Sequence, residues 1–259
     1  MQPAPTRVAL VTGAGRHRVG NTIAAALAEH GFAIALHYYR SAAEADQTRT
    51  LLAARGVAVR TYQADVSQEA DVDRMFAKLK ADFGRLDVLV TAAAVWEPKP
   101  LESITAADVR WQFEINALGT FLCCQRAGLM MARQPEGGSI VTIGDWAIVR
   151  PYSDYAAYFP SKGAIPTMTR NFAVELSRRN PAIRVNCVLP GPVMLPDDIG
   201  EDERRRVTAG TLVRRLGRPE NVAHAVLFLI ENDYVTGVCL PVDGGRTIAG
   251  GESELETHW

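Results

Sequence analysis

The sequence lacks the features that mark several classes of protein. No apolar run approaches the roughly 18 residues of a membrane-spanning helix, and the opening segment MQPAPTR has no basic stretch followed by an apolar one, the pattern of a signal peptide. The net charge of −1 gives no reason to expect nucleic acid or a membrane surface as a partner. We therefore expect a cytoplasmic protein whose partner is a small molecule.

Cysteine is also scarce, with four residues in the chain. They are Cys123, Cys124, Cys187 and Cys239, and their spacing does not resemble that of metal ligands. The sequence therefore predicts buried free thiols and no metal site.

What the sequence does contain is a regular alternation of strand-like and helix-like segments. At 259 residues, 47% of them hydrophobic, the chain has the length of one large α/β domain. The strand-like runs are almost continuously apolar, which is typical of parallel strands buried on both faces. They read RVALVT, FAIALHY, VAVRTYQ, LDVLVTA, SIVTIG, IRVNCVL and GVCLPV. The pattern predicts a single-domain, Rossmann-type doubly wound parallel sheet of about seven strands with helices on both faces.

Two segments interrupt this alternation. Residues 194–218, MLPDDIGEDERRRVTAGTLVRRLGR, form a charged insertion between the sixth strand and the last helix. The insertion is interpreted as a substrate lid or, with equal weight, as a solvated helical excursion. The glycine-rich and charged end of the chain predicts a domain over residues 1–246 and a surface tail over residues 247–259.

A glycine-rich turn follows the first strand. In VALVTGAGRHRVGNT, Gly13, Gly15 and Gly20 precede a helix expected to begin near Asn21. Glycines at such a turn let backbone N–H groups approach a pyrophosphate at the helix N-terminus, whereas the alternative is a tight turn without a ligand. The two arginines of the turn, Arg16 and Arg18, are both candidates for facing the phosphates.

The second and third strands end at further candidate cofactor residues. In LHYYRSAAEA, the sequence Tyr39-Arg40-Ser41 stands where an NAD-binding fold usually has an acidic residue. A guanidinium beside a hydroxyl suits a 2′-phosphate, so NADPH is favoured over NADH, although Arg40 is alternatively an exposed arginine that opens the next helix. Asp65, followed by Val66, is a candidate acceptor for the adenine amino group or an N-cap of the following helix.

The order of the motifs carries a family resemblance. From about Thr6 to Arg246, a glycine-rich turn, ADV, INALGTF, Tyr-x-x-x-Lys and LPGPV follow one another. In this the chain resembles the short-chain dehydrogenase/reductase family. It is most similar to the pteridine reductases and their dihydromonapterin reductase relatives, through the arginine turn around Arg18 and Gly20, HYYRSAAEA, AVWEPKPL and Asp145. The resemblance implies an NADPH-dependent reductase that forms a homotetramer or a homodimer.

Of the three tyrosines in the segment 144–164, one has catalytic spacing. Tyr158 lies four residues before Lys162, so the two share a helix face one turn apart, whereas Tyr152 and Tyr155 do not. An adjacent ammonium and the charge of an oxidised nicotinamide are expected to lower the phenol pKa towards the working range. Tyr158 would then protonate one atom of the substrate double bond while the nicotinamide supplies hydride to the other.

The resemblance implies roles for two more residues. Lys162 would also hold the nicotinamide ribose hydroxyls, and Asn116 in FEINALGTF would hold a water that relays protons to the lysine. The alternative for Asn116 is a helix-interior amide bonded to backbone. On the same helix as the lysine, Pro166 removes a backbone hydrogen bond, which predicts a kink just beyond Lys162.

The chain also departs from the family pattern. Thr91, Ala92, Ala93 and Ala94 replace Asn-Asn-Ala-Gly after the fourth strand, and the missing asparagine normally ties that strand to its neighbours. Leu195 stands where a threonine often follows the PG motif, so contacts to the cofactor carboxamide are expected from backbone. The candidate cofactor residues in these two segments are Ala92, Ala93, Pro190 and Gly191.

Asp145 is the most informative departure, because the family usually has serine there. An ionised carboxylate only accepts hydrogen bonds and would repel the oxyanion that develops in ketone reduction. Either Asp145 is protonated or the substrate presents donors, as pterins do around their C=N bonds. Trp96 aligns with an aromatic residue that stacks on the pterin in the resembling group. The alternatives are a strand-end cap for Asp145 and a loop aromatic packed on the core for Trp96.

Three functions therefore compete. The leading hypothesis is an NADPH-dependent reductase of a pteridine-like C=N compound such as a dihydropterin or dihydrofolate. The second is a carbonyl reductase acting on a 3-oxoacyl thioester, a quinone or a sugar ketone. The third is a cofactor-sensing protein without turnover, against which the intact set of Tyr158, Lys162 and Asn116 argues.

Overall fold

The computed structural model, which describes residues 6–196 and 198–249, confirms the predicted sheet. Its seven strands are all parallel and lie in the order β3-β2-β1-β4-β5-β6-β7. The strands are β1 (Val8–Thr12), β2 (Ala33–Tyr38), β3 (Val59–Gln63), β4 (Val88–Thr91), β5 (Gly138–Ile143), β6 (Ile183–Pro190) and β7 (Cys239–Val242).

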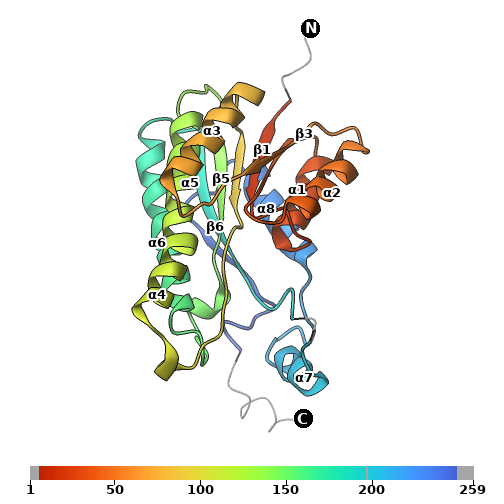
Figure 1. The fold of residues 1–259 in the computed structure, drawn as a ribbon, viewed down its shortest axis with the longest axis vertical. Coiled ribbons are helices and arrows are strands. Elements are labelled where there is room, and N and C mark those ends of the chain that lie inside the picture. The colour runs from red at the N-terminus through yellow and green to blue at the C-terminus, as the bar shows by residue number, and fades with distance from the viewer. Residues whose placement is uncertain (1–5, 197, 250–259) are drawn as a thin grey trace.

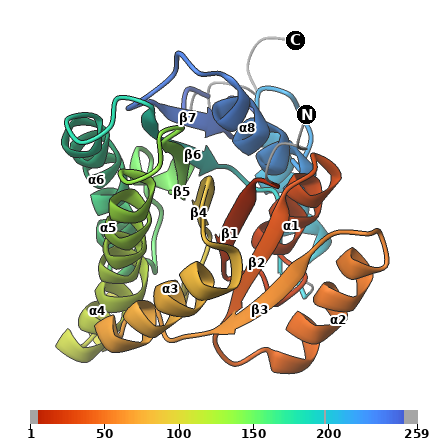
Figure 2. The ribbon, with the colours of Figure 1, turned by 90° about the horizontal axis from the view of Figure 1, so that it is seen from above.

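Helices cover both faces of the sheet, as Figures 1 and 2 show. On one face lie α1 (Val19–Glu29), α2 (Ala42–Ala53) and α8 (Pro219–Glu231), and on the other lie α3 (Glu69–Phe83), α5 (Gly119–Met131) and α6 (Tyr158–Ser177). Each face has its own apolar core, because alternate strand residues point to opposite sides. The short elements are η1 (Leu101–Ser103), α4 (Ala106–Gln112), the π-helix η2 (Phe113–Leu118), η3 (Trp146–Ile148) and α7 (Glu201–Ala209).

The strand order places a ligand site before any side chain is considered. β1 pairs with β2 on one side and with β4 on the other, so the chain reverses its direction of winding between β1 and β4. In open parallel sheets, ligands bind at the carboxyl ends of the strands at this switch point. The site is therefore expected where β1 and β4 end.

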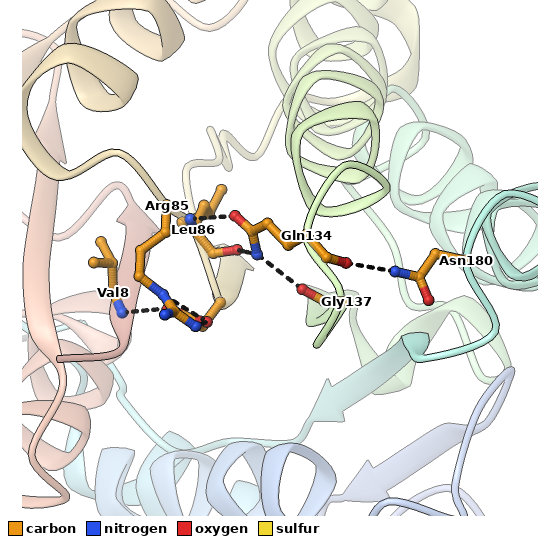
Figure 3. A network of polar contacts seen from close by, with 7 residues as sticks. Val8, Arg85, Leu86, Gln134, Gly137 and Asn180 are labelled. Carbon is orange, nitrogen blue, oxygen red and sulfur yellow. Dashed lines mark hydrogen bonds and ion pairs between the residues drawn. The ribbon is translucent and has the colours of Figure 1, made fainter. Parts of the chain in front are cut away.

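At the opposite side of the sheet, the amino ends of the strands are held by structural polar contacts (Figure 3). Asp87 accepts from the backbone N–H of Val8 at 2.7 Å and forms an ion pair with Arg85. Gln134 accepts from the N–H of Leu86 at 2.8 Å, and its amide donates to the carbonyls of Leu86 and Gly137. Because these side chains are committed to backbone groups, this edge holds the strands together and offers little for chemistry.

Two helices frame the site, and the first of them begins close to its predicted position. α1 starts at Val19, two residues before the expected Asn21, whose side chain instead donates to the carbonyl of Ala14 and to Thr48. α6 starts at Tyr158, and it continues through Pro166 to Ser177. The kink beyond Lys162 stays a prediction.

The charged insertion contains α7, which lies beyond the carboxyl ends of the strands in Figure 1. None of the residues of α7 is buried. Arg246 donates to the carbonyl of Val207 in this helix at 2.6 Å, and Val213 N–H donates to the carbonyl of Gly244. The insertion is thus attached mainly through the segment after β7. Most of the expected tail at 247–259 lies outside the described residues.

Candidate active site

The glycine-rich turn folds tightly over the ends of three strands. Gly13 has φ +67°, and a Cβ there would lie 2.7 Å from the Cα of Ala93 after β4. A Cβ on Gly15 would lie 2.5 Å from the Oγ of Ser41, and one on Gly20 would lie 2.9 Å from the carbonyl oxygen of Gly13. Side chains at these positions would push the turn away from the sheet, so the glycines are required for its shape.

A buried histidine, which the sequence analysis missed, fixes this turn. The backbone N–H of Gly13 donates to Nδ1 of His37 at 3.0 Å, and Nε2 of His37 contacts the carbonyl oxygen of Ala64 at 3.0 Å. Because Nδ1 accepts, the ring proton must be on Nε2. Burial lowers the pKa of His37 to about 4, so the ring is neutral near pH 7.

The neutral His37 predicts an acid-sensitive fold. Its pKa is about 4 in the folded protein against 6.5 as the ordinary value, so below pH 6.5 the unfolded chain takes up a proton that the folded chain does not. We expect this group to remove about 3 kcal/mol from the free energy of unfolding as the pH falls from about 6.5 to about 4.

Urea denaturation over that pH range measures the effect. The His37→Gln variant should show a shallower dependence of the free energy of unfolding on pH than the wild type, whereas His224→Gln, at an exposed position, should keep the wild-type slope. Equal slopes for wild type and His37→Gln would show that His37 already titrates normally in the folded protein.

The N-terminus of α1 is suited to an anion. Its first turn contains no acidic residue, and its N-cap residue, Arg18, forms no side-chain cap hydrogen bond. Arg16 is exposed and lies 3.8 Å from a carboxylate oxygen of Glu44. Among the described residues Arg18 has no such ion pair, so its guanidinium is the better candidate of the two for facing a phosphate.

The three candidate residues after β2 form a corner beside this turn. Ser41 is buried against Gly15 and is the N-cap residue of α2. The guanidinium of Arg40 lies 4.8 Å from the ring centroid of Tyr39 and is exposed at the surface. The corner presents a positive charge and no carboxylate from residues 38–41, as the NADPH hypothesis requires.

Asp65 and Val66 follow β3, the strand that pairs with β2. Asp65 accepts from both the N–H and the hydroxyl of Ser67, at 3.0 and 2.7 Å. The N-cap of α3 is Gln68, so the N-cap alternative for Asp65 is wrong: its carboxylate closes the turn before the helix. Val66 is buried and packs on Gly119 of α5, which leaves its backbone as its contribution to a cofactor site.

The structure brings Asp145, Tyr158 and Lys162 together at the end of β5. Tyr158 donates its hydroxyl hydrogen to Oδ2 of Asp145 at 2.9 Å, while Oδ1 accepts from the N–H of Ala147 at 2.8 Å and so caps η3. Nζ of Lys162, which is buried, donates to the carbonyl oxygen of Ile143 at 2.9 Å. The predicted cap function of Asp145 and its position beside Tyr158 therefore occur together.

The pKa values in this group differ from the sequence expectation. Burial and the charge of Asp145 raise the pKa of Tyr158 well above its ordinary value, so Lys162 does not dominate here, and the lowering in the presence of an oxidised nicotinamide stays a prediction. Burial also raises the pKa of Asp145 and lowers that of Lys162, although the charge of each partly opposes the shift of the other. Tyr158 therefore keeps its proton in this arrangement, and the raised pKa also makes its hydroxyl a weaker acid.

Asn116 lies in the π-helix η2, which sequence patterns did not predict. Its side-chain amide donates to the carbonyl of Val95 and to the hydroxyl of Ser161 at 3.0 Å each, and Oδ1 accepts from the N–H of Val95 at 2.9 Å. Asn116 thus connects the loop after β4 to α6, next to Lys162. These contacts to Val95 match the backbone-bonded alternative, and the proton-relay role stays a prediction.

Asn116 also ties down the loop after β4, where the family asparagine is missing. The hydroxyl of Thr91, the first residue of the segment that replaces the family motif, is buried without a hydrogen-bond partner among the residues that the structure describes. The strand end is tied instead by Asn116 at Val95 and by Thr12, whose Oγ1 accepts from the N–H of Ala93 at 3.0 Å. The replacement of the asparagine therefore leaves the loop anchored.

The PG motif closes the site at the end of β6. Pro190 is the last residue of that strand, and the N–H of Gly191 donates to the carbonyl of Val242 at 2.9 Å. A Cβ on Gly191 would lie 2.5 Å from the Cα of Asp243, so glycine is needed for this close approach. Leu195 lines a hollow of about 330 Å³ between the PG segment and the charged insertion.

Aromatic side chains around Tyr158, together with its own ring, form a wall. The ring of Trp96 is stacked on that of Tyr155, with centroids 5.1 Å apart and an interplanar angle of 11°, and 45% of the surface of Trp96 is exposed. Trp96 therefore packs on an aromatic neighbour and still has surface for a ligand. The wall, which the sequence analysis did not recognise as a unit, consists of Trp96, Trp146, Tyr152, Tyr155, Tyr158 and Phe159.

The wall is coupled to the charged insertion through Arg246. Its guanidinium lies 4.8 Å from the ring centroid of Trp146, which follows Asp145, and the same side chain donates to Val207 in α7.

Within the described ranges no helix is long and apolar enough to cross a membrane, and no cluster of three or more histidine, cysteine or acidic side chains could hold a metal ion.

Comparisons with known proteins identify the family. Residues 13–247 match the family model described as enoyl-(acyl carrier protein) reductase. The chain is 33% identical to the short-chain type dehydrogenase/reductase of Picea abies, over 93% of this chain and 92% of that protein. It is 35% identical to pteridine reductase 1 of Leishmania tarentolae, over 96% of this chain and 99% of that protein.

Solved structures agree with this grouping. The crystal structure of acetoin dehydrogenase from Enterobacter cloacae matches with a TM-score of 0.86 and 32% identity, covering 96% of this chain and 98% of that one. The chain therefore belongs to the short-chain dehydrogenase/reductase family, whose members are oxidoreductases that use NAD(P) cofactors. The differing names of these relatives leave the substrate open.

Proposed function

We propose that this member of the family is an NADPH-dependent reductase of a pteridine-like C=N compound, such as a dihydropterin or dihydrofolate. The observation that carries the proposal is the 2.9 Å hydrogen bond from Tyr158 to Asp145, a carboxylate at the floor of the site. A carboxylate is a poor neighbour for a ketone oxyanion and a good acceptor for ring N–H and amino groups. The likeness to pteridine reductase 1 supports the same substrate class.

In this proposal different side chains bind the substrate ring and transfer the proton. Asp145 accepts from the amino and N–H groups of the ring and orients it, while Trp96 contributes its exposed surface to the ring face. Tyr158 turns its hydroxyl from Asp145 to the substrate and gives its proton to the nitrogen of the C=N bond. The nicotinamide, when bound, supplies the hydride to the carbon. Lys162, one turn further along α6, opposes the charge left on the phenolate.

The residues present also fit the rest of the dinucleotide. The glycine turn approaches β4 so closely that no side chain fits between them, and Arg18 stands at the start of α1. Lys162 uses one of its three N–H donors on Ile143, and among the described residues no other partner takes the remaining two, which suits ribose hydroxyls. We further propose that the insertion at 194–218 is a substrate lid, with Arg246 connecting it to the aromatic wall.

Arg40 sets the proposed preference for NADPH, and replacing it by aspartate tests this. Arg40→Asp exchanges attraction for repulsion at the 2′-phosphate, and we expect NADPH binding to weaken by about 2–4 kcal/mol. Fluorescence titrations with NADPH and NADH give the affinities. Arg55→Asp, which makes the same charge change beyond the end of α2, should leave both affinities unchanged. Equal affinities of the wild type for the two cofactors would overturn the proposed preference.

A carbonyl reductase is the second candidate, and one observation favours it. Burial raises the pKa of Asp145, and a protonated carboxyl would donate a hydrogen bond to a carbonyl oxygen as serine does. A pH-rate profile separates the two: reduction of a ketone that needs protonated Asp145 should decline as the pH rises through the pKa of this carboxyl.

The proposed function is tested by following NADPH consumption with a panel of substrates. The panel contains dihydropterins, dihydrofolate, an acetoacetyl thioester and a diketone. We expect turnover with at least one dihydropterin or with dihydrofolate. Turnover confined to the thioester or the diketone would favour the second candidate, and tight NADPH binding without turnover of any substrate would favour the sensor.

A further inference from the structure

Two of the four cysteines face each other across neighbouring strands. Cys187 of β6 is the register partner of Cys239 of β7, and residues paired in parallel strands point to the same side of the sheet. Both side chains pack in the same small apolar cluster, and the thiol of Cys187 donates to the carbonyl of Val188 at 3.4 Å. Neighbouring strands lie about 4.8 Å apart, inside the roughly 4.4–6.8 Å of Cα separation that a disulfide requires.

The two thiols differ in their surroundings. Cys239 is partly exposed at the edge strand, whereas Cys187 is fully buried. The neighbouring Cys187 thiol and the charge of Arg170 lower the pKa of Cys239, while the neighbouring Cys239 thiol and burial raise the pKa of Cys187. Cys239 is therefore accessible and readily ionised, and Cys187 lies beside it as a buried second thiol.

We propose that Cys187 and Cys239 form a modification site at which a hydroperoxide is reduced and an intrachain disulfide is made. The Cys239 thiolate attacks the peroxide oxygen, giving a sulfenic acid as the O–O bond breaks and water or an alcohol leaves. The Cys187 sulfur then attacks the sulfur of Cys239, the S–O bond breaks, and water leaves. Both thiol protons end in these products, and the two electrons lost by the sulfurs reduce the peroxide.

The site lies directly behind the catalytic residues. A Cβ on Gly144, the residue before Asp145, would lie 3.2 Å from Sγ of Cys187. The disulfide would draw this sulfur towards β7 and away from the end of β5. Oxidation of the thiol pair would therefore shift an atom next to the active site, whatever the substrate is.

Mass spectrometry of the peroxide-treated wild-type protein tests the proposal. The full chain is incubated with a small excess of H₂O₂, quenched with catalase, alkylated in denaturant and digested without reduction. We expect the number of free thiols to fall from four to two and a cross-linked peptide to join Cys187 to Cys239, lighter than the sum of its parts by two hydrogen atoms. Dithiothreitol should restore all the thiols.

The other two cysteines are internal controls. Cys123 and Cys124 are buried in α5, and burial raises the pKa of Cys123 to about 12 and that of Cys124 well above its ordinary value. Both should stay reduced during the peroxide treatment and should therefore be alkylated in the denaturant. In Cys187→Ser, which removes the second thiol, a dimedone adduct should form at Cys239, whereas Cys239→Ser should leave Cys187 unmodified.

Three results would overturn the proposal. The first is that all the thiols stay free under conditions that oxidise exposed methionines. The second is a disulfide that links two chains in place of the intrachain bond. The third is oxidation of Cys123 or Cys124 at the same rate as Cys239, which would show that the register pair has no special reactivity.

Discussion

Replacing Tyr158 by phenylalanine is expected to lower kcat by about 100-fold to 10,000-fold, with NADPH affinity little changed. The substitution removes the hydroxyl that donates to Asp145 at 2.9 Å and keeps the ring in the aromatic wall. General acids contribute about 10²–10⁴-fold to enzymatic rates, and among the described residues Tyr158 is the only hydroxyl that donates to Asp145. Steady-state kinetics with a confirmed substrate, together with an NADPH titration, measure both quantities.

Tyr155→Phe is the matched control. Tyr155 belongs to the same wall and stacks on Trp96 through its ring, which phenylalanine retains. Its kcat should stay within a few-fold of the wild type. If Tyr158→Phe kept near-normal turnover, or if Tyr155→Phe lost as much as Tyr158→Phe, Tyr158 would not be the proton donor.

Replacing Asp145 by serine is expected to exchange one substrate class for the other. Serine cannot accept from ring N–H groups as a carboxylate does, and it donates to a developing oxyanion, which is worth about 10²–10³-fold in rate. Charge-assisted hydrogen bonds to the ring are lost at the same time. The ratio of kcat/KM for a dihydropterin to that for a diketone should therefore fall on the order of 10³-fold.

An Asp145→Asn variant separates charge from shape. The amide keeps the size of the carboxyl and one acceptor oxygen, so the cap on Ala147 remains possible while the negative charge is lost. We expect its ratio to lie between those of wild type and Asp145→Ser. An unchanged ratio in both variants would assign Asp145 to capping η3 and nothing more.

Much of the fold was predictable because its signals are local. Seven apolar runs separated by helical segments gave the strands, and their continuous apolar character gave the parallel sheet. The glycine turn and the four-residue spacing from Tyr158 to Lys162 are also short-range patterns, and both occur where the sequence predicted them.

The remaining features depend on contacts between distant segments. His37 lies in an apolar strand and contacts Gly13 and Ala64, which no pattern around residue 37 indicates. The raised pKa of Tyr158 without cofactor was not predictable, because spacing places Lys162 on the same helix face but does not show that burial and Asp145 dominate. The π-helix around Asn116 likewise coincides with bonds to Val95 and Ser161, which are far away in sequence.

An internal competition tests the proposed C=N reduction most directly. A dihydropterin and a diketone are supplied together at equal concentration, with a limiting amount of NADPH that carries deuterium at the transferred position. Product mass and NMR spectra then show which substrate received the label and at which atom. We predict deuterium on the carbon of the former C=N bond of the pterin. Deuterium on the alcohol carbon of the reduced diketone, with none in the pterin, would contradict the account.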